Sequence, residues 1–214
     1  MRAIPRGPRR RPVTELPCLA VVADGLGGHP SGAIASAIAT DHVLAAKPAH
    51  AEALIASVHE ANRVVVDSMS PDEGTVGMGT TIAAVLVHEG GLAAVNVGDS
   101  PILELADDRL VQLSTDDALI GRASLPGLPS TVVTQTLGGG RALIEVVPHV
   151  HTDDGSGRRR LLLCTDGLTN FVARHDIAGI LRQVDPEQAV AGLVTAALDA
   201  GAPDNVTCML VDIG

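Results

Sequence analysis

Three aspartates that lie far apart in the sequence each stand beside a hydrophobic stretch typical of a buried strand. Asp24 and Asp166 end two of these stretches, and Asp204 precedes the last one. A carboxylate at the end of a buried strand is costly unless a positive charge or a metal ion compensates for it. We therefore interpret the three acids as candidate ligands of a shared cation.

The ligand types in these segments suit a hard divalent cation such as Mg²⁺ or Mn²⁺, which prefers carboxylate, carbonyl and water oxygens. Gly25 can add its backbone carbonyl, because a residue without a Cβ lets the backbone approach a ligand. Two such ions can share one water, lower its pKa and direct it at a phosphorus atom. The alternative is structural, because Asp-Gly pairs are common in turns. The repetition at three strand ends favours the metal site.

Strand and helix patterns around these acids predict an α+β fold. Strand-like runs begin and end the chain and fill its middle. Two helical stretches follow the first strand, and two more precede the last. Helices packed outside antiparallel sheets make a layered sandwich. Residues 114–130 are predicted to be irregular and to lie over the surface. The predicted strands are 18–23, 81–87, 92–97, 102–105, 110–113, 132–135, 142–147, 160–165 and 205–213, and the predicted helices are 31–46, 49–69, 175–182 and 186–200.

The composition limits the classes of partner. The chain has 214 residues, a formal net charge of −10, no Trp or Tyr and a single Phe. Because aromatic platforms and positive charge are both scarce, we expect no nucleic-acid partner. The hydrophobic runs fall short of the roughly 18 residues needed to cross a bilayer, so we expect no membrane span. The three cysteines are far apart and lie in apolar runs, which favours buried thiols in a cytoplasmic protein.

The chain is expected to form one domain, because its length suits a single core and no internal repeat is found. Five arginines and three prolines fall within the first twelve residues. Residues 1–14 are therefore predicted to be a basic, disordered leader, and residues 15–214 the folded domain.

Six short motifs occur in order along the chain: Val22–His29, Gly79–Thr81, Asn96–Ser100, Leu113–Asp117, Leu163–Leu168 and Pro203–Thr207. Together they resemble the metal-dependent protein serine/threonine phosphatases of the phosphatase 2C type, in their compact bacterial form. The resemblance covers roughly residues 18–213.

This resemblance implies a four-layer α-β-β-α sandwich, in which two central antiparallel sheets are flanked by helices and a binuclear Mn²⁺/Mg²⁺ site lies at one edge. Asp24 would bridge both ions, and Gly25 would offer its carbonyl to one of them. Asp166 and Asp204 would bind the other ion. Asp116 matches the family's acid for a third, weakly bound ion, which Asp166 would share.

The reaction implied by the resemblance is hydrolysis of phosphoserine and phosphothreonine in proteins by a hydroxide that bridges the two metal ions. No side chain is expected to act as a nucleophile. The substrates would be phosphoproteins, the products of a bacterial serine/threonine kinase, in the cytoplasm. Asp99 is interpreted as a turn residue between two strands rather than as a ligand.

The chain departs from the family pattern in three places. The family's first strand carries an arginine that grips phosphate and an acidic metal ligand, and the corresponding residues 7–14 contain no acid. We expect either that the natural chain begins farther upstream or that the protein lacks part of the ligand set of its second metal ion. Leu26 stands where some relatives have a histidine, so water is expected to protonate the leaving group. The flap, about residues 114–135, is shorter than usual.

Other candidate sites are assigned to structure. His149 and His151 would share one face of a strand, but no cysteine or acid completes a zinc site, so they are interpreted as surface residues. Gly138–Gly140 lacks the Lys-Ser/Thr pair of a phosphate-binding loop. Two other functions are left open: a catalytically weak or inactive phosphatase-like domain that binds a phosphoprotein or a regulatory partner, and a purely structural domain.

Overall fold

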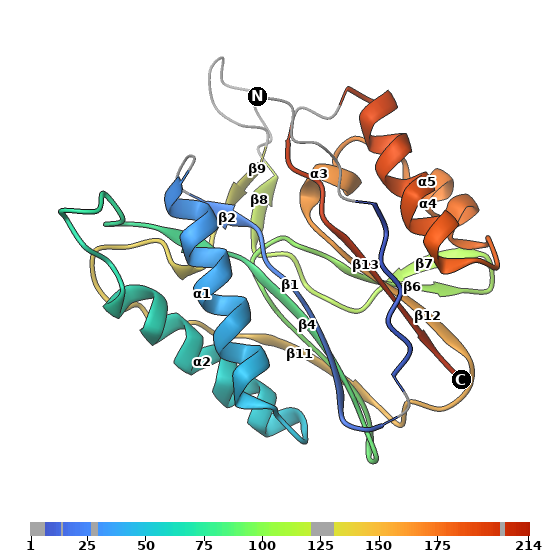
Figure 1. The fold of residues 1–214 in the computed structure, drawn as a ribbon, viewed down its shortest axis with the longest axis horizontal. Helices are drawn as coiled ribbons and strands as arrows, with labels where there is room; N and C mark the ends of the chain where they lie inside the picture. The colour runs from blue at the N-terminus through green and yellow to red at the C-terminus, as the bar shows by residue number, and fades with distance from the viewer. Residues whose placement is uncertain (1–6, 14, 27–29, 121–130, 202–203) are drawn as a thin grey trace.

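Two stacked antiparallel sheets lie between two groups of helices in the computed structural model of this chain, which describes residues 7–13, 15–26, 30–120, 131–201 and 204–214 (Figure 1). The first sheet has the order β1 (Cys18–Val22), β4 (Ile82–His88), β5 (Gly91–Val97) and β11 (His149–Asp153). The second sheet has the order β13 (Cys208–Ile213), β12 (Arg159–Cys164), β6 (Ile102–Ala106) and β7 (Arg109–Gln112).

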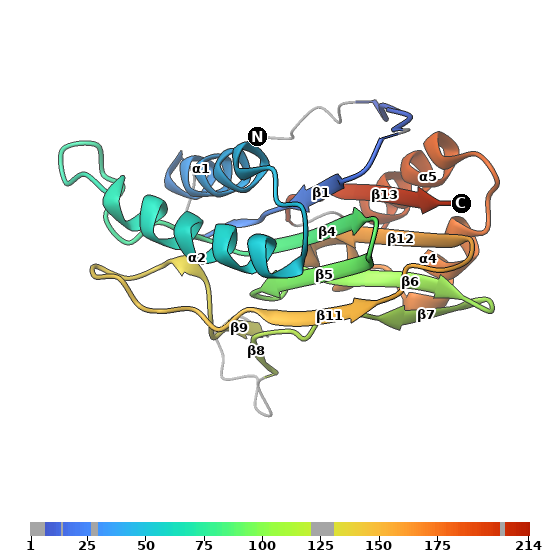
Figure 2. The ribbon, with the colours of Figure 1, turned by 90° about the horizontal axis from the view of Figure 1, so that it is seen from below.

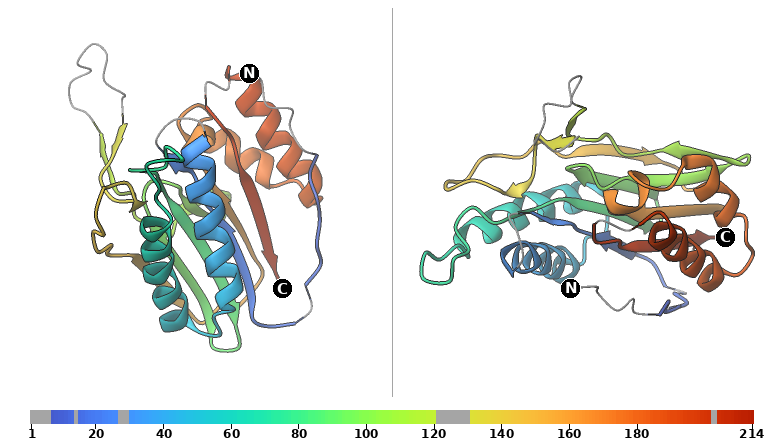
Figure 3. Two further views of the ribbon diagram at one scale, coloured as in Figure 1. Left: turned by 60° about the vertical axis from the view of Figure 1, so that its left-hand side comes forward. Right: turned by 90° about the horizontal axis from the view of Figure 1, so that it is seen from above.

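The helices cover the outer faces of these sheets. Helices α1 (Pro30–Ala46) and α2 (Ala51–Asp67) pack on the first sheet, and α3 (Asp166–Thr169), α4 (Arg174–Leu181) and α5 (Pro186–Asp199) pack on the second. Figures 1 and 3 show α1 and α2 on one side of the stacked sheets and α4 and α5 on the other. Strands β1 and β13 contact each other across the sheets although they come from opposite ends of the chain (Figure 2). No helix in the described ranges is long and apolar enough to cross a membrane.

Three hydrophobic cores fill the spaces between the four layers, and single strands contribute to two of them. In β4, Ile82 and Leu86 face α1 and α2, whereas Val85 faces the second sheet. In β12, Leu163 faces the first sheet, whereas Leu162 faces the helices α3–α5. Alternate side chains of a strand point to opposite faces, so a strand between two apolar layers is hydrophobic throughout. The predicted four-layer sandwich is confirmed.

The predicted hairpin across Asp107 and Asp108 is also confirmed. Strands β6 and β7 pair directly on either side of it, and the two aspartates have φ angles of 45° and 67°. A two-residue turn with both φ angles positive matches the right-handed twist of the strands, and Asp tolerates that conformation.

Several predicted elements differ from the structure. Residues 142–147 form no strand, and the strand that pairs with β5 is β11, farther along the chain. β8 (Ala118–Ile120) lies within the segment 114–130 that was predicted to be irregular. It pairs with β9 (Thr131–Val133), which overlaps the strand predicted at 132–135. The sequence also gave no sign of α3 or of the small sheet formed by β10 (Leu137–Gly138), β3 (Gly79–Thr80) and β2 (Gly25–Leu26). Of the predicted leader, residues 7–13 are exposed and form no helix or strand, and residues 1–6 and 14 lie outside the described residues, as does part of the flap, 121–130.

A charged network joins the two sheets at the start of β12. The Arg159 guanidinium donates two hydrogen bonds to Glu104, both at 2.7 Å, and a third to Asp153 at 2.6 Å. Only 10% of the Arg159 side chain is exposed. Burial alone would raise the pKa of Asp153, but the hydrogen bonds from Arg159, Gly155 and His151 bring it below its usual value. The network therefore compensates the charges that the packing of the sheets removes from water.

We expect Arg159→Ala to lower the free energy of unfolding by about 3 kcal/mol, because two partly buried carboxylates lose their positive partner. Urea denaturation measures this change. Arg182→Ala is the matched control, because it removes an exposed arginine whose nearest acid oxygen, in Asp108, is 3.5 Å away. This control should cost less than about 1 kcal/mol. Equal effects of the two substitutions would contradict the role given to the network.

Candidate functional site

Asp24 is held at the end of β1 by bonds to its backbone. Its N–H donates to Thr81 Oγ1 at 3.0 Å, and its carbonyl accepts from the Thr81 N–H and the Thr80 hydroxyl, each at 2.8 Å. The Thr81 hydroxyl is buried against Ser100 Oγ, 2.7 Å away. These bonds fix the direction in which the chain leaves β1 and enters β2.

Gly25 lies against the start of α1, where there is no room for a side chain. A Cβ added at Gly25 would lie 2.0 Å from the carbonyl oxygen of Gly32, and one added at Gly32 would lie 2.6 Å from the carbonyl oxygen of Gly25. Contacts this short between backbone atoms and a Cβ are not tolerated, so both positions require glycine. Helix packing is a reason for Gly25 that the sequence alone did not reveal, and its role as a carbonyl ligand stays a prediction.

Thr165 and Gly167 bring the loop that carries Asp204 to the end of β12. The Thr165 N–H donates to the Thr207 carbonyl at 3.1 Å. The Thr165 hydroxyl accepts from the Thr207 N–H at 3.1 Å and donates to the Asn205 carbonyl at 3.2 Å. A Cβ at Gly167 would lie 2.2 Å from the same Asn205 oxygen, so glycine permits this approach.

The acids from these strand ends repel one another. Burial and three neighbouring negative charges raise the pKa of Asp24 to about 7. The three neighbours are Asp166, Asp204 and Asp99, in order of effect. Burial and then Asp204 raise the pKa of Asp166. The structure therefore brings the three predicted aspartates into one electrostatic cluster.

Asp99 belongs to the same cluster, although the sequence analysis assigned it to a turn. Burial, and then the charge of Asp166, raises the pKa of Asp99 to about 6, with a smaller contribution from Asp116. Asp99 also lies in a bend after β5, so the predicted turn is present and the residue belongs to the acid cluster as well. The missed signal was the pattern already used for Asp24, because Asp99 also follows a fully buried strand.

Asp116 lies at the exposed rim of the cluster, on the side of Asp99. Its carboxylate accepts a hydrogen bond from Gln112 Nε2 at 2.6 Å. Partial burial raises the pKa of Asp116 above its usual value, although the Gln112 bond and the charge of Arg174 act in the opposite direction. Asp116, the fourth predicted acid, therefore lies beside the cluster, with Asp99 as its neighbour there.

The residue after Asp116 anchors the segment that carries it. The Asp117 carboxylate accepts from the Gly98 N–H at 2.9 Å, from Gln135 Nε2 at 2.9 Å and from His149 Nε2 at 2.8 Å. In addition, the Asn96 side chain exchanges hydrogen bonds with the backbone of Thr115. The segment is thus tied to β5 and β11 on both sides of Asp116.

The donor chemistry of the cluster fits a hard divalent cation, because carboxylates with raised pKa values repel each other until a positive charge is added. The cage itself is not preformed. Among the described residues, no three His, Cys, Asp or Glu side chains converge closely enough to hold one ion. His149 and His151 instead pair with Asp117 and Asp153, so the two histidines do not form a metal pair.

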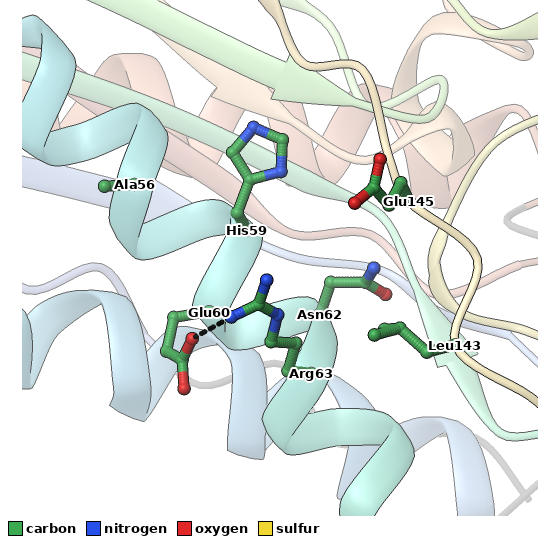
Figure 4. A pocket seen from close by; sticks show the side chains of 7 residues that line it. All are labelled: Ala56, His59, Glu60, Asn62, Arg63, Leu143 and Glu145. Carbon is green, nitrogen blue, oxygen red and sulfur yellow. Dashed lines mark hydrogen bonds and ion pairs between the residues drawn. The ribbon is translucent and has the colours of Figure 1, made fainter.

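A separate hollow lies between α2 and the segment 143–145 (Figure 4). Its volume is about 470 Å³, and none of the predicted ligands lines it. The buried Asn62 side chain ties α2 to the segment that contains Leu143 and Glu145, since it donates to the Ile144 carbonyl at 2.8 Å. It also accepts from the Gly138 N–H at 2.8 Å. The lining residues are Ala56, His59, Glu60, Asn62, Arg63, Leu143 and Glu145.

Comparisons with known proteins agree with this geometry. The sequence model of the family described as Protein phosphatase 2C matches residues 13–211. The chain is 30% identical over 210 residues to the serine/threonine protein phosphatase PstP of Mycobacterium tuberculosis, a match that covers 91% of this chain and 40% of PstP. It is also 30% identical over 218 residues to the serine/threonine phosphatase stp of Listeria welshimeri, covering 91% of this chain and 84% of stp. The chain therefore spans about two-fifths of the length of PstP and most of the length of stp.

A similar solved structure is the catalytic domain of PstP in complex with two manganese ions. The TM-score is 0.78 and the sequence identity 29%, and the match covers 91% of this chain and 86% of that one. The four-layer arrangement is therefore shared with a domain that binds two metal ions.

The raised pKa of Asp24 predicts how the stability of the metal-free protein depends on pH. Between the ordinary Asp pKa of 3.8 and about 7, folded Asp24 keeps a proton that the unfolded chain has lost. The free energy of unfolding therefore falls as pH rises through this range. We expect Asp24→Asn to flatten the decline and to raise the Tm at pH 8, with EDTA present, by about 2–4 °C, which corresponds to about 1 kcal/mol.

Thermal unfolding followed by circular dichroism between pH 4 and pH 8 checks this expectation. Asp72→Asn is the control, because Asp72 is an exposed acid in the turn between α2 and β3. A Tm for Asp24→Asn at pH 8 that is no higher than that of the control would show that Asp24 is not electrostatically strained.

Proposed function

The chain belongs to the protein phosphatase 2C family, and from this premise we propose that it hydrolyses phosphoserine and phosphothreonine in proteins. The observation that carries the proposal is the cluster of Asp24, Asp99, Asp166 and Asp204. Burial and the neighbouring negative charges raise the pKa values of Asp24, Asp99 and Asp166. A divalent cation would relieve this repulsion, and divalent cations assist the hydrolysis of phosphate esters.

The proposed ligands of two Mn²⁺ or Mg²⁺ ions are the side chains of Asp24, Asp166 and Asp204 and the carbonyl of Gly25. Asp116 would hold a third, weaker ion together with Asp166. The donor types support this assignment, and so does the similarity to a phosphatase domain that holds two manganese ions. Bound there, a divalent cation supplies a water of lowered pKa and offsets the charge of the phosphate.

The residues of the chain set the conditions for this chemistry. Hydroxyl groups of Thr80, Thr81 and Thr165 hold the backbone at two strand ends, so neutral groups keep the acids together. Because the pKa of Asp24 is about 7, a cation must displace a proton at neutral pH. Cation binding is therefore expected to strengthen as pH rises through this range.

The proposed substrates are phosphorylated proteins, in keeping with the names of the relatives, and the opposing enzyme would be a bacterial serine/threonine kinase. We place the reaction in the cytoplasm.

The alternative function is a phosphatase-like domain that binds a phosphoprotein or regulatory partner with little or no hydrolysis. The observation that favours it is that no three acids among the described residues form a ready-made cage for one ion. In that case the protein would bind a phosphopeptide without releasing phosphate, with or without Mn²⁺.

We expect purified protein with Mn²⁺ to release phosphate from p-nitrophenyl phosphate and from phosphothreonine peptides, and EDTA to stop both reactions. Asp166→Asn removes charge from the centre of the cluster and should lower kcat/KM at least about 100-fold. Mn²⁺ should also raise the Tm of the unaltered protein and leave the Tm of Asp166→Asn nearly unchanged.

Asp72→Asn serves again as the exposed control and should retain full activity. A protein that shows no rise of Tm with Mn²⁺ and no turnover would contradict the proposal. A protein that binds Mn²⁺ but releases no phosphate would support the alternative function.

A further inference from the structure

One arginine lies beside the acid cluster without being neutralised by it. Arg174 is the first residue of α4 and is exposed. Within the described residues, its guanidinium makes one hydrogen bond, from Nη2 to the side-chain oxygen of Gln112, and no ion pair. Gln112 in turn donates to Asp116. Arg174 is therefore separated from Asp116 by a single amide side chain.

Most of the hydrogen-bonding capacity of Arg174 is unused in these contacts. A guanidinium carries five N–H donors in a planar fork that matches carboxylate and phosphate groups. The bond to Gln112 occupies one of them and fixes the direction of the side chain. The remaining donors are available to an anion that approaches the cluster from the Asp116 side.

The position of Arg174 in its helix is unfavourable for stability. A helix N-terminus carries partial positive charge, so a cation in the first turn is disfavoured. Ala173, the residue before the helix, makes no side-chain capping bond. A residue that destabilises its own helix in this way is expected more often at functional sites than elsewhere.

Arg174 also differs from the other arginines with known contacts. Arg159 and Arg160 have bidentate carboxylate partners, Arg63 pairs with Glu60, and Arg182 lies near Asp108. Arg174 instead acts on Asp116 without an ion pair among the described residues: burial raises the pKa of Asp116, and the charge of Arg174 partly opposes that rise. Its charge therefore acts on the rim of the cluster.

We propose that Arg174 is a specificity-determining residue, which binds an anionic group of the substrate on the Asp116 side of the acid cluster. The shared chemistry is an oxyanion that accepts two hydrogen bonds from the guanidinium. It can be the phosphate itself or a carboxylate beside the phosphorylated residue. This inference rests on the proposed phosphatase function, because it assumes that a phosphorylated substrate is placed over the cluster.

The test compares Arg174→Ala with the unaltered protein on four ligands in the presence of Mn²⁺. These are p-nitrophenyl phosphate, inorganic phosphate as an inhibitor, and phosphothreonine peptides with either acidic or neutral neighbours. Loss of a charge-assisted pair of hydrogen bonds should raise KM about 10-fold and change kcat little. Arg174→Lys keeps the charge without the planar fork and should recover part of the loss.

The pattern across the ligands identifies the anion. A rise of KM limited to the acidic peptide assigns Arg174 to a neighbouring carboxylate. A rise of KM for all substrates, with weaker inhibition by inorganic phosphate, assigns it to the phosphate. Unchanged KM values for every substrate would overturn the proposal.

Two further variants separate recognition from a structural role. Arg182→Ala removes an arginine from the other end of α4 and should leave every KM unchanged. Gln112→Ala breaks the link between Arg174 and Asp116 but leaves the arginine in place. If Gln112→Ala reproduced the whole effect of Arg174→Ala, with a higher Mn²⁺ requirement in both, Arg174 would act only through Asp116 and the proposal would be wrong.

A binding measurement keeps the inference testable if the protein shows no turnover. Fluorescence anisotropy of a labelled acidic phosphothreonine peptide gives its Kd for the unaltered protein and for Arg174→Ala. A Kd about 10-fold weaker for the variant supports anion recognition even where the proposed hydrolysis fails. An unchanged Kd contradicts it, whatever the outcome for hydrolysis.

Discussion

Repulsion among carboxylates at one edge of the sandwich is the constraint on which the local structure depends. Asp24, Asp99 and Asp166 are partly buried, and burial together with neighbouring negative charges raises their pKa values. Bonds to neutral groups keep them there: threonine hydroxyls hold the backbone, and glycines at positions 25 and 167 allow close contact between segments. Because no ion pair among the described residues involves these three acids, the negative potential of the cluster is preserved for a ligand.

The two ends of β12 show opposite solutions to the problem of buried charge. At its start, Arg159 satisfies Glu104 and Asp153 with three short hydrogen bonds. Beyond its end, Asp166 faces other acids. The first arrangement stabilises the contact between the sheets, whereas the second is unfavourable in the metal-free protein. Such local costs are typical of functional sites, where stability is given up for binding.

Sequence patterns predicted those features that are set locally. The buried strands that lead to Asp24 and Asp166, the helices and the turn at Asp107 all carry short-range signals, and the structure has them. The apolar segment 142–147 misled because it looked like a strand, whereas the polar β11 became one by pairing with the edge of β5. Asp99 was assigned to a turn because aspartate after glycine is common in turns, and its position after a fully buried strand, the signal used for Asp24, was not applied to it. The ligand roles of Asp24, Gly25, Asp116, Asp166 and Asp204 stay predictions.

The alternation of side chains in β4 and β12 has a consequence for how the molecule comes apart. Each of these strands belongs to two hydrophobic cores at once, and the middle core is built from both sheets. Loss of the helices from one side would expose the outer face of β4 or β12, while the inner face of the same strand still packs against the other sheet. No layer can therefore detach while its neighbours keep their packing, and loss of structure should spread through the whole sandwich as one cooperative event.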